Sequence, residues 1–297
     1  MPAPRGAVSD AAASARAGRA ASGRVLARLP KAPWTNVWRM DAMPDNEAVL
    51  SALDRSGFLL EQRVAGALDR AGFTVRISAA YVDPDEQKNR EIDVVAVRKV
   101  RGRDGTERAA WLVIAVECKS SPMPHVAFLR EWNQWDRKNL PWEVRLPYAM
   151  EGRARLLDEW VIHRINSTHR AVQVVRIDRD NSKFKARSDL HETGLPTIKA
   201  AYDLRKTYGS PDRYPVISFP AAVVNGELYT IESGDYESPT LTPTDFVVVS
   251  YENRSPWMSR DHVRSHYDLV RYASIENWIM HVNNVTGRVA EHLPRKL

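Results

Sequence analysis

The sequence predicts a mixed α/β protein in which a β-sheet is covered by helices. Three observations predict this class. Two long β-branched runs, residues 92–100 and 111–119, follow each other in the chain. An amphipathic helical pattern precedes them at 57–71. A second amphipathic pattern closes the chain at 274–293, so helices are expected on both sides of the strand-rich region.

The composition is that of an ordinary soluble globular protein, with 297 residues of which 43% are hydrophobic and 27% are charged. No linker-like stretch interrupts residues 41–297, so we expect one domain there, after a flexible, basic, Ala/Arg-rich leader at 1–40. A mitochondrial presequence is an alternative interpretation of the leader. No apolar run approaches the roughly 20 residues that a membrane-spanning helix needs. The single cysteine, Cys118, excludes an intrachain disulfide, and we expect a cytoplasmic protein with no membrane partner.

The net charge of +6 belongs mostly to the first part of the chain, because residues 1–44 hold seven basic and two acidic side chains. It is therefore weak evidence that the folded body binds nucleic acid. Two further patterns stay open between nucleic-acid contact and ordinary structure. They are a series of arginines (Arg153, Arg155, Arg164, Arg170, Arg176 and Arg179) and a series of tryptophans (Trp132, Trp135, Trp142 and Trp160).

The first half of the body is expected to fold as two helices and three strands. The helices are predicted at 45–55 and 57–71, with Ser56 as the N-cap of the second and Gly72 as its end. Three strands are predicted to follow at 73–82, 92–100 and 111–119. A hairpin at 102–106, with Arg103-Asp104-Gly105 as a three-residue turn, joins the last two strands.

The second half is expected to begin with a helical insertion around 122–170, broken at two prolines. Asn225-Gly226 predicts a tight hairpin between the strands that flank it. The other predicted elements are a strand at 172–177, a helix at 195–208, hairpin strands at 214–224 and 227–231, a strand at 246–251 and a helix at 274–293.

Two acids and a lysine stand out around the end of the third strand. Glu117 and Lys119 share one face of that strand because side chains alternate, and Cys118 takes the other face. With a three-residue turn, Asp93 lies opposite Ala115 and one diagonal step from Glu117. A two-residue turn would place Asp93 on the opposite face of the sheet.

This set of side chains suits phosphodiester hydrolysis. Two carboxylates can hold a hard divalent cation such as Mg²⁺, which prefers oxygen ligands and keeps several waters. The cation activates a water, and Lys119 orients that water or stabilises the charge that develops on the phosphate. Glu61, in the middle of the preceding helix, would support the cation directly or through water. A solvated glutamate on a helix surface is the alternative interpretation of Glu61.

The same residues resemble the PD-(D/E)xK, or restriction-endonuclease-like, nuclease superfamily. The resemblance lies in Glu61 on a helix, in Glu91-Ile92-Asp93-Val94-Val95, and in Glu117-Cys118-Lys119 after Val113-Ile114-Ala115-Val116. It covers residues 56–121 well, and the later part is similar to large uncharacterised bacterial members. Ile92, and not a proline, precedes Asp93, which is a departure from the name-giving motif.

The resemblance implies a central four-stranded mixed sheet in α-β-β-β-α-β order, with an added hairpin and a C-terminal helix. It also implies that Asp93 and Glu117 bind Mg²⁺, or Mn²⁺ in its place, and that Lys119 is the catalytic lysine. The backbone carbonyl of Cys118 would be a further metal ligand. The expected function is Mg²⁺-dependent cleavage of nucleic acid, as a DNA endonuclease in defence or restriction, with a homodimer as one assembly such enzymes use.

Two other functions remain open from the sequence. The first is a non-catalytic module for nucleic-acid binding or assembly on the same fold. The second is an unrelated α/β enzyme, which the lack of a Gly-x-Ser-x-Gly motif and of a phosphate-binding loop disfavours.

Overall fold

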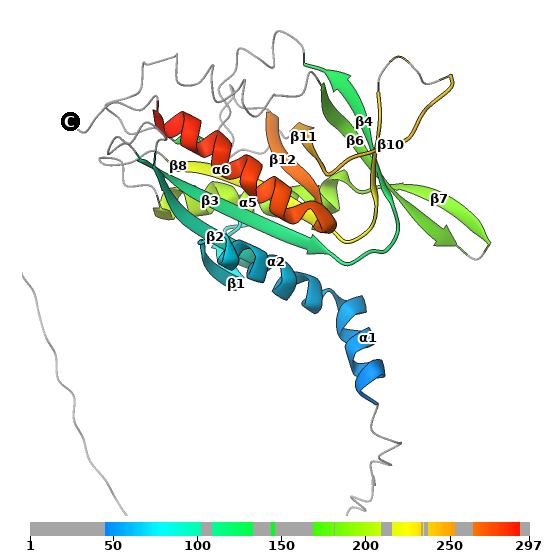
Figure 1. Cartoon of the computed structure of the whole chain (residues 1–297), viewed down its shortest axis with the longest axis horizontal. Helices are drawn as coiled ribbons and strands as arrows, with labels where there is room; N and C mark the ends of the chain where they lie inside the picture. The colour runs from blue at the N-terminus through cyan, green and yellow to red at the C-terminus, as the bar shows by residue number, and fades with distance from the viewer. Residues whose placement is uncertain are drawn as a thin grey trace, which may run out of the picture. The chain divides into compact units, whose positions relative to one another are not determined.

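The computed structural model describes residues 45–101, 109–132, 144–145, 169–180, 182–208, 216–232, 234, 237–252 and 264–291. It confirms a mixed α/β protein built on one large mixed sheet with helices against it (Figure 1). The predicted leader at 1–40, the turn at 103–105 and most of the predicted helical insertion lie outside the described residues.

Four helices and a series of strands make up the described part of the chain. The helices are α1 (Asn46–Ser56), α2 (Phe58–Arg70), α5 (Leu190–Tyr208) and α6 (Ile275–Glu291), with a short 3-10 turn at Tyr272–Ser274. The strands of the first part are β1 (Thr74–Val82), β2 (Asn89–Arg101), β3 (Ala109–Lys119), β4 (His125–Glu131), β5 (Val144–Arg145), β6 (His169–Asp180) and β7 (Lys183–Ser188). Those of the second part are β8 (Val216–Val224), β9 (Leu228–Ile231), β10 (Thr242–Pro243), β11 (Phe246–Glu252) and β12 (Arg264–Arg271).

Strands β1, β2 and β3 form an antiparallel meander, as their β-branched alternation predicts. After α5, the chain adds β8 parallel to β3, with Trp111 level with Val216 and Lys119 level with Val224. Between β3 and α5 the chain forms β4, β5, β6 and β7, which the expected α-β-β-β-α-β order does not contain. The expected sheet of four strands is too small, because the order continues from β8 through β12, β11, β6, β4 and β9 to β10.

Helices cover both faces of the sheet beside β2, β3 and β8 (Figure 1). On one face, Leu60 and Leu68 of α2 pack with Trp278 of α6 against even-numbered positions of β3. On the other face, Ile198 and Leu204 of α5 pack against its odd-numbered positions. Side chains that alternate along a strand explain why one apolar run serves both clusters. The helices that pack on both faces of the sheet hold the end of β3 in position.

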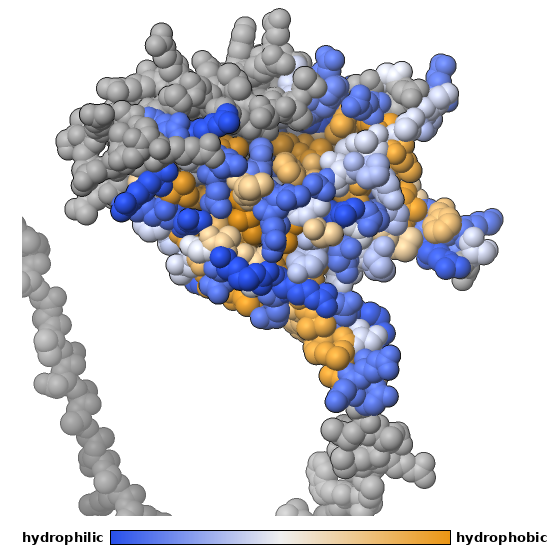
Figure 2. All heavy atoms as spheres, in the orientation of Figure 1, coloured by the Kyte–Doolittle hydropathy of each residue, from blue (hydrophilic) through white to orange (hydrophobic). Residues whose placement is uncertain are grey.

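The two N-terminal helices are confirmed, but they join differently from the prediction. Asp45 caps α1 by accepting a hydrogen bond from the Ala48 N–H at 2.7 Å. Gly57, with φ of 92°, ends α1 and precedes α2, so Ser56 is the last residue of α1 and not an N-cap. None of the side chains of α1 is buried, and Figure 2 shows hydrophobic surface on this helix; Leu50 is 57% exposed.

Two predictions for the second half are wrong. The described part of residues 122–170 is not helical, since it contains β4, β5 and the start of β6. Strands β8 and β9 do not form a hairpin about Asn225-Gly226, because β8 pairs with β3 and β12 whereas β9 pairs with β4 and β10. Gly226 serves a close backbone approach, since a Cβ there would lie 2.3 Å from the Met123 carbonyl oxygen.

The predicted strands at 172–177 and 246–251 and the predicted helices at 195–208 and 274–293 are confirmed as β6, β11, α5 and α6. Strands β7 and β12 were not predicted. In the parts of the chain that the structure describes, no helix combines the length and the apolar character required to cross a membrane.

Candidate active site

Asp93 and Glu117 lie at the same level of neighbouring strands. The β2–β3 ladder pairs Val95 with Ala115 and Val94 with Val116, so the next positions are Asp93 and Glu117. The predicted register, with Asp93 opposite Ala115, is therefore wrong by two residues. A shift of two residues keeps the face, because the side-chain period of a strand is two. That Asp93 and Glu117 share a face stays a prediction, because β2 departs from strict alternation at Asp93.

The Asp93 carboxylate takes the place of the next ladder bond. Its Oδ2 accepts a hydrogen bond of 2.6 Å from the Cys118 N–H. On the other side of β2, the ladder to β1 skips Ser78, the residue opposite Asp93, which has a φ of 51°. Ile92 packs with the α5 cluster although Val94 packs with the α2 and α6 cluster. Strict alternation would place both in one cluster, so β2 changes its orientation at Asp93.

Glu117 and Lys119 form an ion pair on the accessible side of β3, with 2.8 Å between Lys119 Nζ and Glu117 Oε1. Their side chains are 16% and 31% exposed, respectively. The shared face predicted for them is thereby confirmed. Cys118, between them, is buried in the α2 and α6 cluster, and burial raises the pKa of its thiol well above the usual value. It is a core residue whose backbone N–H holds Asp93.

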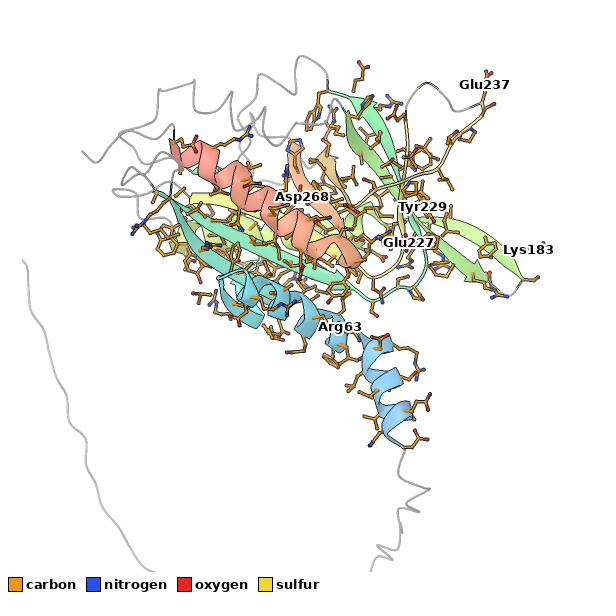
Figure 3. All side chains as sticks on the ribbon, in the orientation of Figure 1. Arg63, Lys183, Glu227, Tyr229, Glu237 and Asp268 are labelled. Carbon is orange, nitrogen blue, oxygen red and sulfur yellow. The ribbon has the colours of Figure 1, made fainter. Side chains whose placement is uncertain are left out.

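The N-terminal end of α2 brings Glu61 to the same place. Ser120, which follows β3, donates a hydrogen bond of 2.7 Å from its Oγ to the Asp54 carbonyl oxygen. Arg63, labelled in Figure 3, pairs with the Asp54 carboxylate at 3.0 Å and ties α1 to α2. Burial first, and then the charges of Glu117 and Glu91, raise the pKa of Glu61. Glu61 therefore lies in the field of the β3 acid, which the sequence left open.

The electrostatics of this group are dominated by negative charge. Burial first, then the charge of Glu117 and to a smaller extent that of Glu61 raise the pKa of Asp93, which is about 7 with all contributions included. The Cys118 N–H and the charge of Lys119 act in the opposite direction, but they do not compensate. Three carboxylates thus share one ammonium group, and we call Glu61, Asp93, Glu117 and Lys119 the Asp93 cluster.

The donor set of the Asp93 cluster suits a hard divalent cation, since its acids offer only oxygen ligands and carry excess charge. Among the described residues, however, no three His, Cys, Asp or Glu side chains are grouped closely enough to hold a metal ion. The pairing of Glu117 with Lys119 and of Asp93 with the Cys118 N–H occupies part of the acceptor capacity. The predicted role of the Cys118 carbonyl as a ligand stays a prediction.

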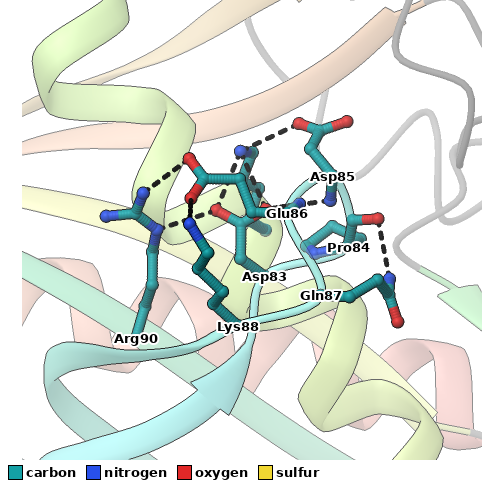
Figure 4. Close-up of polar contacts among 8 residues, drawn as sticks. Asp83, Pro84, Asp85, Glu86, Gln87, Lys88 and Arg90 are labelled. Atoms are coloured by element: carbon teal, nitrogen blue, oxygen red, sulfur yellow. Dashed lines mark hydrogen bonds and ion pairs between the residues drawn. The ribbon is translucent and has the colours of Figure 1, made fainter.

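A second charged group lies at the turn between β1 and β2 (Figure 4). The Asp83 side chain is only 2% exposed. Both oxygens of Asp83 accept from Lys199 Nζ of α5, at 3.0 and 2.9 Å, and Arg90 Nε lies 3.1 Å from Oδ2. Asp85 also pairs with Lys199 at 2.8 Å. We call Asp83, Asp85, Arg90 and Lys199 the Asp83 cluster.

The burial of Asp83 alone would raise its pKa. The hydrogen bonds and charge of Lys199, together with the backbone N–H groups of Asp85 and Glu86, more than offset burial, so the pKa of Asp83 is lowered. This network was not predicted, because residue 83 and residue 199 are far apart in the sequence and no local pattern connects them. Its closed pairing indicates a structural role.

Two further residues of interest, Trp132 and His125, are buried in the folded protein. Trp132 is buried, and the Arg170 guanidinium lies 5.0 Å from its ring centroid, so this pair packs inside the protein. His125 is fully buried and its Nε2 lies 3.0 Å from Asp189 Oδ2. Trp135, Trp142, Trp160, Arg153, Arg155 and Arg164 lie outside the described residues.

Comparison with protein-family models, with curated proteins and with solved structures gave no match. The case for a function therefore depends on the residues of this chain.

Proposed function

We propose that this protein is a Mg²⁺-dependent nuclease that hydrolyses phosphodiester bonds in DNA. The observation that carries the proposal is the Asp93 cluster, in which three carboxylates of α2, β2 and β3 act on one another electrostatically beside one lysine, so that negative charge is in excess. Strongly perturbed carboxyl groups beside a specific charge partner are typical of functional sites. A bound cation would balance the excess negative charge of the cluster.

The elements of the fold support the same proposal. Helix α2, the β1–β2–β3 meander, α5 and β8 parallel to β3 are elements that the resemblance to PD-(D/E)xK nucleases implies, with strands β4 to β7 inserted between β3 and α5. Asp93 lies on β2 and the Glu117-Cys118-Lys119 segment ends β3, which are the strands where the resemblance would put the motif. Endonuclease action and a role in defence or restriction are part of the proposal by analogy with that superfamily.

Each residue of the cluster has a role in the proposed reaction. Asp93 and Glu117 would hold the cation, and Glu61 would support it directly or through water. When bound, the cation would neutralise charge on the phosphate and favour deprotonation of a water. Lys119, held by Glu117 within 2.8 Å, keeps an ammonium group beside the same carboxylate and stabilises the charge that develops on the phosphate. The Cys118 N–H fixes the orientation of Asp93.

The test is cleavage of supercoiled and linear DNA with Mg²⁺ by the wild type, Asp93→Ala and Lys119→Ala. We expect both substitutions to lower the rate by about 100-fold or more, since each removes a charge that acts on the reacting phosphate. Lys88→Ala is the matched control, because Lys88 is an exposed lysine at 74% that lies outside the Asp93 cluster. Circular dichroism of each variant confirms that it is folded.

Metal-dependent cleavage that persists at the wild-type rate in both variants would remove the assignment. The alternative is a non-catalytic nucleic-acid-binding module on the same fold. In that case calorimetry would show DNA binding without Mg²⁺, no Mg²⁺ site that depends on Asp93, and no cleavage by the wild type.

A further inference from the structure

A two-stranded ribbon extends from the sheet beyond the strands that hold its base. The pairing of β6 with β4 ends where Arg176 meets His125, and β6 pairs with β11 only at Ala171. From Ile177 to Asp180, β6 pairs with β7 alone among the described strands. Every residue of β7 is exposed, and Lys183 lies at the far end of the ribbon, pointing away from the sheet (Figure 3). We call residues 176–180 and 182–188 the β6–β7 ribbon.

The ribbon carries an excess of positive charge on one face. Lys183, Lys185 and Arg187 alternate along β7, so their side chains share a face. The register places Arg176, Asp178 and Asp180 opposite them on β6. Asp180 pairs with Lys185, and Asp178 pairs with Arg187 at 3.2 Å and with Arg176 at 2.7 Å. Arg176, at the base, also lies 3.9 Å from Asp189. The three cations of β7 thus face two carboxylates of β6, and the face keeps a net positive charge.

The opposite face presents an aromatic ring to solvent. Phe184 is 68% exposed, the highest value among the large hydrophobic side chains described, and it lies opposite Arg179 in the ladder. Charged lysines on a strand edge can be explained as protection against edge-to-edge aggregation. That explanation does not account for an exposed phenylalanine on the same strand, since an apolar ring makes an edge more prone to association. A polyanionic partner that also carries apolar groups explains both the cationic face and the exposed Phe184.

The base of the ribbon lies close to the Asp93 cluster. The Ile177 N–H donates a hydrogen bond of 2.9 Å to the carbonyl oxygen of Pro124. Pro124 follows Lys119 by five residues, so at most about 18 Å of chain separates Lys119 from this contact. Gly226 fits closely against the carbonyl oxygens of Ser121 and Met123, which fixes the connecting segment. A ligand on the ribbon therefore lies within about one turn of a DNA duplex from the cluster.

We propose that the β6–β7 ribbon inserts into the major groove of double-stranded DNA and holds the duplex beside the Asp93 cluster. This inference deepens the proposed nuclease function and depends on it. The major groove of B-DNA is about 12 Å wide and admits a two-stranded β-ribbon. The deep, narrow major groove of A-form RNA does not admit one. The cationic face contacts phosphates, and Phe184 contacts base edges such as thymine methyl groups.

The test measures DNA binding separately from cleavage. Fluorescence anisotropy in EDTA reports binding of a labelled duplex, about two helical turns long, to the full chain across a range of salt concentrations. The variant carries Lys183→Gln, Lys185→Gln and Arg187→Gln. Its control carries Lys88→Gln, Arg70→Gln and Lys206→Gln, exposed positions with the same total change of charge and none of them in the ribbon or the Asp93 cluster. Hydrolysis of bis(p-nitrophenyl) phosphate, which is too small to reach the ribbon, reports the proposed function.

We expect the ribbon variant to bind the duplex at least about tenfold more weakly than the control at moderate salt. Its slope of log affinity against log salt should be smaller by about 2 to 3, since each lost phosphate contact removes about 0.9. Phe184→Ala should weaken duplex binding by a smaller factor with an unchanged slope, because it removes no charge. Hydrolysis of the small diester should be equal in all variants.

Equal affinity and equal slope in the ribbon and control variants would overturn the ribbon proposal. It is also overturned if single-stranded DNA or duplex RNA loses as much affinity as duplex DNA, or if the ribbon variant only aggregates more readily. A wild type that binds DNA through the ribbon but hydrolyses no diester would instead contradict the proposed nuclease function, so the two failures are distinguishable.

Discussion

The Asp83 cluster, at the turn between β1 and β2, and the Asp93 cluster, on α2, β2 and β3, both combine carboxylates with basic side chains, yet their charges are balanced in opposite ways. Asp83 is almost fully buried and receives hydrogen bonds from Lys199 and an ion pair from Arg90 (Figure 4). Its pKa is lowered in spite of burial. Asp93 is less deeply buried and has acids as neighbours, and its pKa is raised to about 7.

The difference separates a structural ion network from a binding site. A buried carboxylate is tolerated when its own chain supplies the opposite charge, as Lys199 does for Asp83. The Asp93 cluster places carboxylates together and supplies one lysine, which is unfavourable for the fold alone. Folded proteins keep such unfavourable arrangements mainly where function requires them. The comparison thus gives a physical reason to look for a cation at Asp93 and not at Asp83.

The largest expected effect on stability comes from removing the cation of the Asp83 cluster. Lys199→Met keeps the length of the side chain, but among the described residues it leaves the half-exposed Arg90 as the cationic partner of Asp83. We expect the free energy of unfolding in urea at pH 7 to fall by about 3 kcal/mol, since removing one member of a buried pair leaves a charge uncompensated. The loss should shrink below about pH 4, because a protonated Asp83 no longer needs the cation.

Lys88→Met is the control for this prediction. Lys88 lies 3.5 Å from Glu86 but is 74% exposed, and its removal should change stability by less than about 0.5 kcal/mol. If Lys199→Met unfolds at the same urea concentration as the wild type, the Asp83 cluster is not a closed network of buried charges, and its contrast with the Asp93 cluster disappears.

The second prediction concerns the Asp93 cluster, where removing a charge should raise the free energy of unfolding instead of lowering it. Asp93→Asn keeps an oxygen that can accept from the Cys118 N–H but removes the charge. A carboxyl group whose pKa is raised on folding lowers stability progressively as the pH rises from about 4 to about 7. We therefore expect Asp93→Asn to be about 1 to 3 kcal/mol more stable than the wild type at pH 8 without metal, and equally stable at pH 4. Urea unfolding at the two pH values measures the difference.

Addition of Mg²⁺ sharpens this test. A cation that binds the folded wild type raises its apparent stability by mass action and should leave the Asn variant unchanged. An Asp93→Asn variant that is less stable than the wild type at pH 8 would show that the charge of Asp93 is compensated in the folded protein, contrary to the electrostatic argument.

The local elements of the core could be predicted from the sequence because their signals are local. The β-branched runs of β2 and β3 and the amphipathic pattern of α6 are complete within their own segments. The predicted register of β2 and β3 is two residues off, because it is counted from an assumed turn at 103–105 and no side-chain pattern within either strand fixes the count. Strand β12 is polar in sequence, and its Asp268 accepts from Trp278 Nε1 at 2.9 Å, a contact made only in the folded protein.

The candidate site likewise has features that could be predicted from the sequence and features that could not. The common face of Glu117 and Lys119 follows from strand alternation, whereas the contact of Asp93 with the Cys118 N–H depends on a change of orientation in β2 that no local pattern predicts. The contribution of Glu61 depends on how α2 begins beside Ser120, and the link between Asp83 and Lys199 joins distant segments. Charge balance is a property of such long-range contacts, so the sequence could name the acids but not say which of them are compensated.

The smallest expected effect tests whether Glu61 belongs to the Asp93 cluster. Glu61→Gln removes a charge that raises the pKa of Asp93, so Asp93 should titrate at a lower pH, which side-chain carbon NMR of the metal-free protein measures directly. Stability at pH 8 should rise by a few tenths of a kcal/mol, and this gain should disappear in the Asp93→Asn background because the repulsion then has no partner. Glu47→Gln, on exposed α1, is the control. If the pKa of Asp93 is the same in the wild type, Glu61→Gln and Glu47→Gln, Glu61 is a solvated helix residue. The raised pKa of Asp93 then comes from burial and Glu117 without Glu61.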